Sequence, residues 1–103
     1  MTDYHELSPL DKIAEYHRLF RYDPATGDLI RREGTMLPQH KRLEGLPAGS
    51  LGGHRYLQAR VNGKMVLAHR IIYEMANGPI PEGMQIDHIN GVRIDNRLEN
   101  LGI

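Results

Sequence analysis

Residues 55–70, RYLQARVNGKMVLAHR, contain the strongest structural signal in this chain. Apolar and polar side chains alternate over residues 57–61, which is the period of a strand with one buried face. Asn62 and Gly63 follow, and they indicate a two-residue hairpin because a type I′ turn needs positive φ at both positions. From Ala68 the apolar residues recur at helical spacing. The stretch therefore predicts an antiparallel hairpin that leads directly into a helix.

The residues before this stretch predict a helix, a second hairpin and a loop. Ser8 followed by Pro9 is typical of a helix N-terminus, and we expect an amphipathic helix from residue 9 to about residue 20. Residues 20–32, FRYDPATGDLIRR, predict the hairpin, because Pro, Thr and Gly supply turn chemistry between two strand-like flanks. Residues 33–50 show no clear period and predict a loop, with a strand beginning at its end.

The central helix that starts at Ala68 has its stop signal at Asn77 and Gly78, where glycine can take the left-handed cap. Residues 78–86, GPIPEGMQI, then predict a rigid connection into a short strand. We therefore predict a single α+β domain over residues 1–103. It has an N-terminal helix, a small antiparallel sheet built on hairpins, and a central helix.

Length and composition exclude several classes of protein. A chain of 103 residues has room for one domain with a modest core. Cysteine is absent, which excludes a disulfide framework and a cysteine-ligated zinc site and favours a reducing cytoplasm. No apolar run approaches the ~20 residues of a membrane span, and the N-terminus MTDYHELSPL predicts no signal peptide. We expect a cytoplasmic protein without a membrane partner.

Charge is unevenly distributed along the chain. The net charge is zero, which by itself argues against a nucleic-acid partner. However, residues 17–70 hold ten basic residues against four acidic ones, and the two ends together are acidic. A basic middle can present a local electrostatic footprint for phosphates. The alternative is an ordinary solvated surface, and charge alone does not decide between them.

The polar face of the first strand in residues 55–70 carries Tyr56, Gln58 and Arg60. One interpretation is a sheet with one solvated face, which is usual for antiparallel structure. The other is a strand face laid on DNA, where cations contact phosphates and Gln58 reaches a base edge. For the group as a whole we favour the DNA interpretation, and Arg55 and Lys64 extend it.

Residues 87–101, DHINGVRIDNRLENL, place a carboxylate beside an imidazole. Such a pair lets one group bind a divalent cation while the other takes a proton from water. Adjacent side chains on a strand point to opposite faces, so Asp87 and His88 can serve one phosphate only where the strand ends or twists. Asn90 and Gly91 form a turn signal that permits this. By spacing alone, however, the pair is more often a surface pair or a structural histidine.

The longer run AHRIIYEMANGPIPEGMQIDHINGVRIDNRLENL, residues 68–101, closely resembles the HNH endonucleases of phage and intron homing type. The stretches FRYDPATGDLIRR and GGHRYLQARVNGKMVLAHR are similar to the N-terminal half of the same proteins. The resemblance implies a DNA-contact half in residues 19–67 and a partial HNH motif, of the ββα-metal fold, in residues 68–103. It implies a metal-dependent DNA endonuclease or nickase that hydrolyses a phosphodiester bond.

Carried over to this sequence, the resemblance also implies residue roles. His88 is expected to be the general base, Asp87 a metal ligand, and Asn100 the asparagine that braces the loop and helps to orient the histidine. One Mg²⁺ or Mn²⁺ ion and double-stranded DNA are the expected cofactor and partner. His69 also matches a family position, and we interpret it as structural rather than phosphate-contacting. The predicted DNA contacts are Arg55, Gln58, Arg60, Lys64, Arg70, Arg93 and Arg97.

In the family, further strand and an α-helix with the last metal ligand follow the central asparagine, whereas this sequence ends at residue 103. We therefore expect an incomplete motif, and three interpretations stay open. The sequence is a fragment of a nuclease, or takes its last ligand from another histidine or a second subunit. Alternatively, it is a catalytically inactive DNA-binding module. In the third interpretation it is an inhibitor or interaction protein, with a homodimer or protein partner at an exposed C-terminal strand.

The helix of the complete motif would cover apolar side chains at the C-terminal end of this chain. We expect these side chains to pack on the central helix or on a partner subunit instead, because together they would otherwise form an exposed apolar patch. They are Ile86, Ile89, Ile94, Leu98, Leu101 and Ile103.

Overall fold

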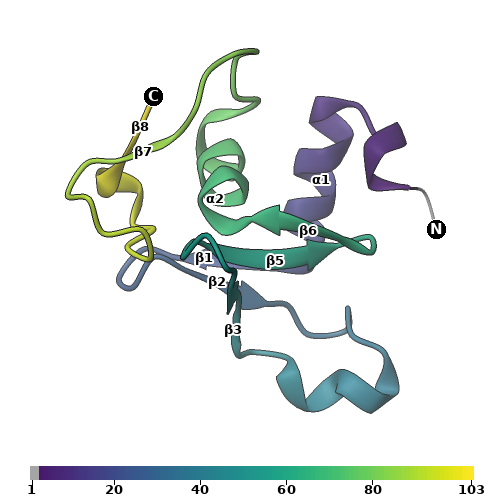
Figure 1. Ribbon diagram of the computed structural model, residues 1–103. Coiled ribbons are helices and arrows are strands. Elements are labelled where there is room, and N and C mark those ends of the chain that lie inside the picture. The colour runs from purple at the N-terminus through teal and green to yellow at the C-terminus, as the bar shows by residue number, and fades with distance from the viewer. Residues whose placement is uncertain (1–2) are drawn as a thin grey trace.

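The computed structural model describes residues 3–103, and Figure 1 shows short strands arranged around two α-helices. The elements in chain order are η1 (Tyr4–Glu6), α1 (Pro9–Leu19), β1 (Phe20–Asp23), β2 (Asp28–Arg31), η2 (Pro38–Leu43), β3 (Pro47–Ala48), β4 (Ser50–Leu51), β5 (Leu57–Val61), β6 (Lys64–Leu67), α2 (Ala68–Asn77), β7 (Asp87–His88), η3 (Leu98–Asn100) and β8 (Leu101–Gly102). Within residues 3–103 the strands form three small antiparallel sheets, β1-β2-β3, β4-β5-β6 and β7-β8. The predicted α+β class is confirmed.

The helix α1 begins as its sequence predicts. The Ser8 hydroxyl accepts a hydrogen bond from the Asp11 backbone N–H (3.1 Å), which satisfies one of the free donors at the helix N-terminus. Phe20 has an extended backbone, with φ −135° and ψ 153°, so the helix ends at Leu19 and the chain passes directly into β1. Tyr16 is the residue of α1 that is buried in the core. The helix α1 also packs against α2.

The β1–β2 hairpin supports the C-terminal part of the chain. Its register runs from Phe20 opposite Arg31 to Asp23 opposite Asp28, as expected for the predicted hairpin. Gly27 in its turn has φ +80°, and a Cβ there would lie only 2.5 Å from the backbone nitrogen of Arg97. Close approach of two backbones therefore requires glycine at this position.

The second hairpin forms the middle of the fold. Asn62 has φ 47° and Gly63 has φ 83°, which are the positive values that the predicted type I′ turn needs. Ala59 and Val61 are buried on the side covered by α2. The helix α2 follows β6 without a side-chain cap at its N-terminus, so packing of its buried residues holds it in place. Those residues are Ala68, His69, Ile71 and Ile72.

The segment predicted as a loop, residues 33–50, contains more regular structure than expected. It includes the 3₁₀ turns of η2, and then β3, in which Ala48 pairs with Leu29 of β2. The predicted strand at its end is present as β4, in which Ser50 pairs with Gln58. The sequence did not predict η2 or β3 because their short hydrogen-bonded stretches depend on contacts with distant strands.

Only half of the C-terminal apolar side chains pack as expected. Leu101 belongs to the buried core, and Ile86 and Leu98 pack against it. In contrast, Ile89 and Ile94 are 66% and 56% exposed, and Ile103 is 50% exposed. A protein partner over these three isoleucines stays a prediction. Over residues 3–103, no helix has the length and apolar content that crossing a bilayer requires.

Candidate functional site

The predicted Asp-His pair lies on β7, at the edge of the molecule where the C-terminal segment approaches α2 (Figure 1). His88 pairs with Leu101 of β8 and is 7% exposed, whereas Asp87 pairs with Gly102 and is exposed. Adjacent residues on a strand face opposite sides, which accounts for the difference. The imidazole is therefore held in the protein interior, and the carboxylate is open to solvent.

Asn96 is the hydrogen-bond partner of the His88 ring. The distance from His88 Nε2 to Asn96 Oδ1 is 2.8 Å, and the Asn96 side chain is 1% exposed. An amide oxygen can only accept, so this contact requires the proton of a neutral imidazole to be on Nε2. The lone pair of the neutral ring is then on Nδ1. Nothing in the sequence distinguished Asn96 from the other asparagines of the segment, so it was missing from the predicted site.

The Nδ1 atom of His88 is not fully buried. It makes no hydrogen bond within residues 3–103, and part of its surface remains uncovered. The fully buried, unpartnered atoms within residues 3–103 are Glu44 Oε1, His69 Nδ1 and Asn96 Nδ2. A basic nitrogen in an otherwise buried ring can therefore meet a water molecule or a ligand.

Asn100 braces the loop between β7 and η3. Its Oδ1 accepts from the backbone N–H of Asn90 (2.9 Å), and its Nδ2 donates to Asn90 Oδ1 (2.9 Å) and to the backbone oxygen of Asp95 (2.9 Å). These three bonds fix both ends of the loop that carries Asn96. Asn100 thus contacts both ends of this loop, and the side-chain contact with the histidine is made by Asn96.

Asp95 and Arg97 form a two-point ion pair within the same loop. Arg97 Nε donates to Asp95 Oδ1 (2.9 Å) and Arg97 Nη2 donates to Asp95 Oδ2 (2.8 Å). The Arg97 guanidinium lowers the pKa of the Asp95 carboxyl well below its usual range, and Asp95 in turn raises the pKa of Arg97. Because its guanidinium already donates two hydrogen bonds to Asp95, Arg97 supports the loop and is less available for a DNA phosphate.

Two aromatic neighbours pack against His88. The His69 ring lies edge-on to it, with ring centroids 4.9 Å apart, and the Tyr56 ring is 5.6 Å from His88 and 5.2 Å from His69. Burial, followed by the charge of a protonated His88, lowers the pKa of His69 from 6.5 to about 4. His69 is therefore a neutral packing partner at neutral pH, in agreement with its structural interpretation.

Arg93 is an exposed cation next to this ring cluster. Its guanidinium lies 5.2 Å from the centroid of the Tyr56 ring, and its Nη1 donates to the backbone oxygen of His54 (3.2 Å). Cation–π contact and this hydrogen bond hold the side chain beside the residues that touch His88. Arg93 is thus a predicted DNA contact that packs on Tyr56, a ring neighbour of His88.

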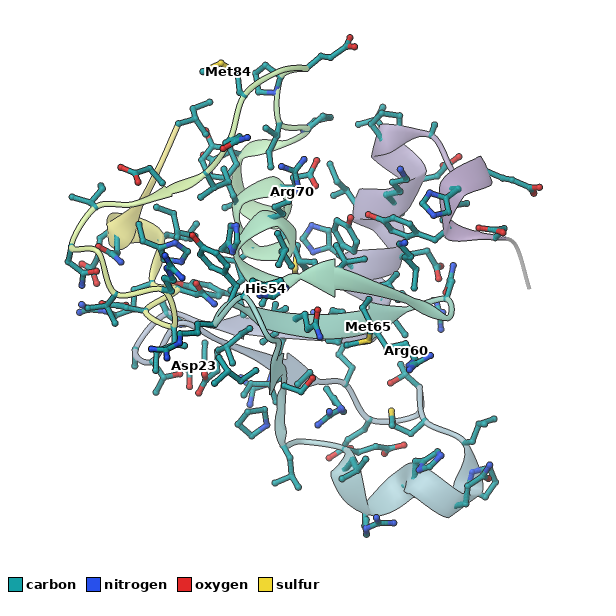
Figure 2. The ribbon with its side chains drawn as sticks, in the orientation of Figure 1. Asp23, His54, Arg60, Met65, Arg70 and Met84 are labelled. Atoms are coloured by element: carbon teal, nitrogen blue, oxygen red, sulfur yellow. The ribbon has the colours of Figure 1, made fainter. Side chains whose placement is uncertain are left out.

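The other predicted DNA contacts do not share one surface. Gln58 and Arg60 line a cleft beside the β5–β6 hairpin. Arg70 lies on α2 near the buried tyrosines of the N-terminal segment, and Figure 2 shows it on the other side of this hairpin from Arg60. Arg55 and Lys64 are exposed. The structure therefore separates these five residues into at least two faces.

Oxygen ligands for a metal ion are sparse at the site. Within residues 3–103, no group of three or more His, Cys, Asp or Glu side chains is arranged so that it could hold a metal ion. Asp87 provides one exposed carboxylate next to His88. Mg²⁺ is usually held by one or two carboxylates together with water and substrate phosphates, so this donor set fits an ion that binds together with DNA.

Comparison with known proteins identifies the segment that carries the site. The HNH endonuclease family matches residues 66–102, which include Asp87, His88, Asn96 and Asn100. Protein 3.8 of Escherichia phage T7 is similar to this chain, with 52% identity over 33 residues that make up 32% of this chain and 27% of that protein. The match thus spans about a quarter of the relative. No solved structure matches. Residues 66–102, from β6 to β8, are thus similar to the HNH endonuclease family.

Proposed function

We propose that this protein is a metal-dependent DNA endonuclease or nickase that hydrolyses a phosphodiester bond with His88 as its general base. The observation that carries the proposal is the state of the His88 ring. It is buried, bonded through Nε2 to Asn96, and without a hydrogen-bond partner at Nδ1 within residues 3–103, in a segment that matches the HNH family. A general base needs this combination of a fixed ring and one free lone pair that can reach water.

His88 Nδ1 would take the proton of the attacking water. Asn96 then stabilises the resulting imidazolium, because the Nε2–H bond to its amide oxygen persists and becomes charge-assisted. The Asn100 contacts keep the loop and its Asn96 in place during this step. Arg93 is placed to bind a DNA phosphate near the reacting group.

Asp87 is the proposed ligand for one Mg²⁺ or Mn²⁺ ion. Its exposed carboxylate is a hard oxygen donor on the residue next to the base, and the scissile phosphate supplies further oxygens. Such an ion stabilises negative charge on the phosphoryl group and the leaving oxygen when it is bound. We place the activity on double-stranded DNA in the cytoplasm of a bacterial or phage-infected cell.

A nicking assay tests this function. Supercoiled plasmid is incubated with Mg²⁺ or Mn²⁺ and with the wild-type protein, His88→Ala or His88→Gln. We expect both variants to lose about 10²–10⁴-fold in rate, which is the usual contribution of a general base. His17→Ala is the matched control, because His17 is an exposed histidine on α1. Thermal unfolding of each variant establishes that it is folded.

Two results would contradict the proposal. Nicking that persists in both folded His88 variants excludes this histidine as the base. Salt-sensitive DNA binding by a wild-type protein that never nicks favours the inactive DNA-binding module instead, since phosphate contacts alone make binding depend on salt. If the protein neither nicks nor binds DNA, the remaining interpretation is an interaction protein that uses the exposed isoleucines near the C-terminal strand.

A further inference from the structure

A cleft of about 520 Å³ lies apart from the ring cluster around His88. It is formed by the polar side of the β5–β6 hairpin and by the segment that contains η2. Arg60 and Met65 pair across the hairpin and both line the cleft, and Figure 2 shows them next to each other. A volume of this size is typical of a small-molecule site.

The lining of the cleft combines positive charge with apolar surface. Arg18, Arg31 and Arg60 contribute cations, and no Asp or Glu is part of the lining. Phe20 and Met65 are among the apolar residues that line the same space. This composition is complementary to a ligand that has a flat apolar part and a negatively charged part.

Two of the three arginines keep their charge available. Arg18 is paired with Glu15 (2.8 Å), but Arg31 Nη1 donates to the backbone oxygen of Pro47 (2.7 Å) and Arg60 Nη1 to that of Gly63 (3.4 Å). Within residues 3–103, no carboxylate pairs with Arg31 or Arg60. Their positive charge is therefore not neutralised inside the protein.

The same strand connects the cleft to His88. Gln58 and Arg60 line the cleft, and Tyr56, two residues before Gln58, packs against the His88 ring. Residues two apart on a strand are separated by about 7 Å. The Gln58 amide makes no side-chain hydrogen bond within residues 3–103, so it is available to the edge of a base. The cleft and the ring cluster around His88 thus include residues that are two positions apart in the chain, Gln58 and Tyr56.

We propose that this cleft binds one unstacked nucleotide of the DNA strand that is cut, close to the bond on which His88 acts. The base packs on Met65, and the phosphate contacts Arg31 and Arg60. Its role as a substrate subsite rests on the proposed nuclease function. The affinity of the cleft for a nucleotide does not depend on the nuclease function, because the cations and the apolar surface of the cleft are independent of His88.

Titration of the ¹⁵N-labelled protein with dAMP, followed by NMR, tests the cleft. We expect dAMP to shift the backbone signals of Gln58, Arg60 and Met65. Arg60→Gln should weaken binding roughly tenfold, because it removes a charge-assisted hydrogen bond. Arg21→Gln is the matched control and should bind within about twofold of wild type, since Arg21 is an exposed arginine of β1 that does not line the cleft. The NMR spectrum of each variant also shows whether it is folded.

Three outcomes would overturn the nucleotide site. Inorganic phosphate that binds as tightly as dAMP makes the cleft an anion site only. Equal effects of Arg60→Gln and Arg21→Gln make binding a property of net charge, and dAMP that shifts no cleft signal removes the site. His88→Ala separates the two proposals: it should bind dAMP like wild type while losing nicking. A wild-type protein that binds dAMP in the cleft but never nicks leaves the nucleotide site standing and refutes the nuclease.

Discussion

At the scale of single residues, the chemistry of the site depends on two buried side chains beside His88. Asn96 bonds to Nε2 at 2.8 Å, and His69 packs edge-on against the same ring. The first sets which nitrogen carries the proton, and the second limits how far the ring can turn. Each of these side chains buries one polar atom without a hydrogen-bond partner, Nδ2 of Asn96 and Nδ1 of His69. Burying such an atom costs free energy, which the packing around the side chain must offset.

Asn96→Ala should slow nicking about 10–100-fold, in the range seen when partners that orient an active group are removed. The cause is loss of the acceptor that keeps the proton of His88 on Nε2. The ¹⁵N shifts of the His88 ring should then report a mixture of tautomers, a change that a purely structural defect would not produce. Asn77→Ala is the control, because Asn77 is an exposed asparagine at the end of α2. A wild-type tautomer in folded Asn96→Ala would refute the assignment.

His69 should make the protein less stable in acid. Its pKa is about 4 in the folded state and 6.5 ordinarily, so the unfolded chain takes up the proton first as pH falls. The free energy of unfolding therefore decreases between about pH 6.5 and pH 4, by about 2 kcal/mol at pH 5 relative to pH 7. Urea unfolding at both pH values measures the loss. In His69→Gln the decrease in unfolding free energy between pH 7 and pH 5 should be smaller by that amount. An unchanged decrease would contradict the role of His69 in the acid sensitivity.

At the scale of elements, the turn of the β1–β2 hairpin supports the loop that carries Asn96. The Tyr22 hydroxyl accepts from the backbone N–H of Leu98 (2.8 Å), and Gly27 lies directly under the backbone of residues 96 and 97. A short hairpin far away in the sequence therefore sets the position of the residue that bonds to His88.

Gly27→Ala should destabilise the protein more than Gly34→Ala. Both glycines have φ near +80°, so both substitutions carry the left-handed backbone cost of about 1–2 kcal/mol. Only at Gly27 would the new methyl group meet backbone, 2.5 Å from the Arg97 nitrogen, whereas nothing lies within 4 Å of it at Gly34. Thermal unfolding should show a larger drop in Tm for Gly27→Ala by several degrees. Equal drops would mean that the loop moves away without cost.

At the scale of the whole molecule, the site is assembled from segments that are distant in the sequence. His88 comes from β7, Asn96 from the following loop, His69 from α2, and Tyr56 from the residue before β5. The sequence predicted the Asp-His pair because a long motif marks it, and it predicted a bracing role for Asn100. It did not predict Asn96, because two further asparagines occur within residues 87–101 and their spacing does not tell which side chain turns inward.

The predicted DNA contacts also show which features the sequence predicts and which depend on tertiary structure. Their charge is visible in the sequence, but charge does not say which residues share a face. Packing of α2 on the β5–β6 hairpin leaves Arg60 on the cleft side and takes Arg70 to the side of the helices. The predicted DNA contacts therefore lie on more than one face, with Arg60 along the cleft and Arg70 on the side of the helices.

The amino-acid sequence by itself determined the local structure, because each turn and cap depends on a few neighbouring residues. Asn62 and Gly63 tolerate the positive φ of their turn, and the Ser8 side chain caps the N-terminus of α1. Tertiary structure alone decided the partner of His88, the need for glycine at position 27 and the existence of the cleft. These features arise where separate elements meet, and the contacts made there depend on how all of the elements pack together.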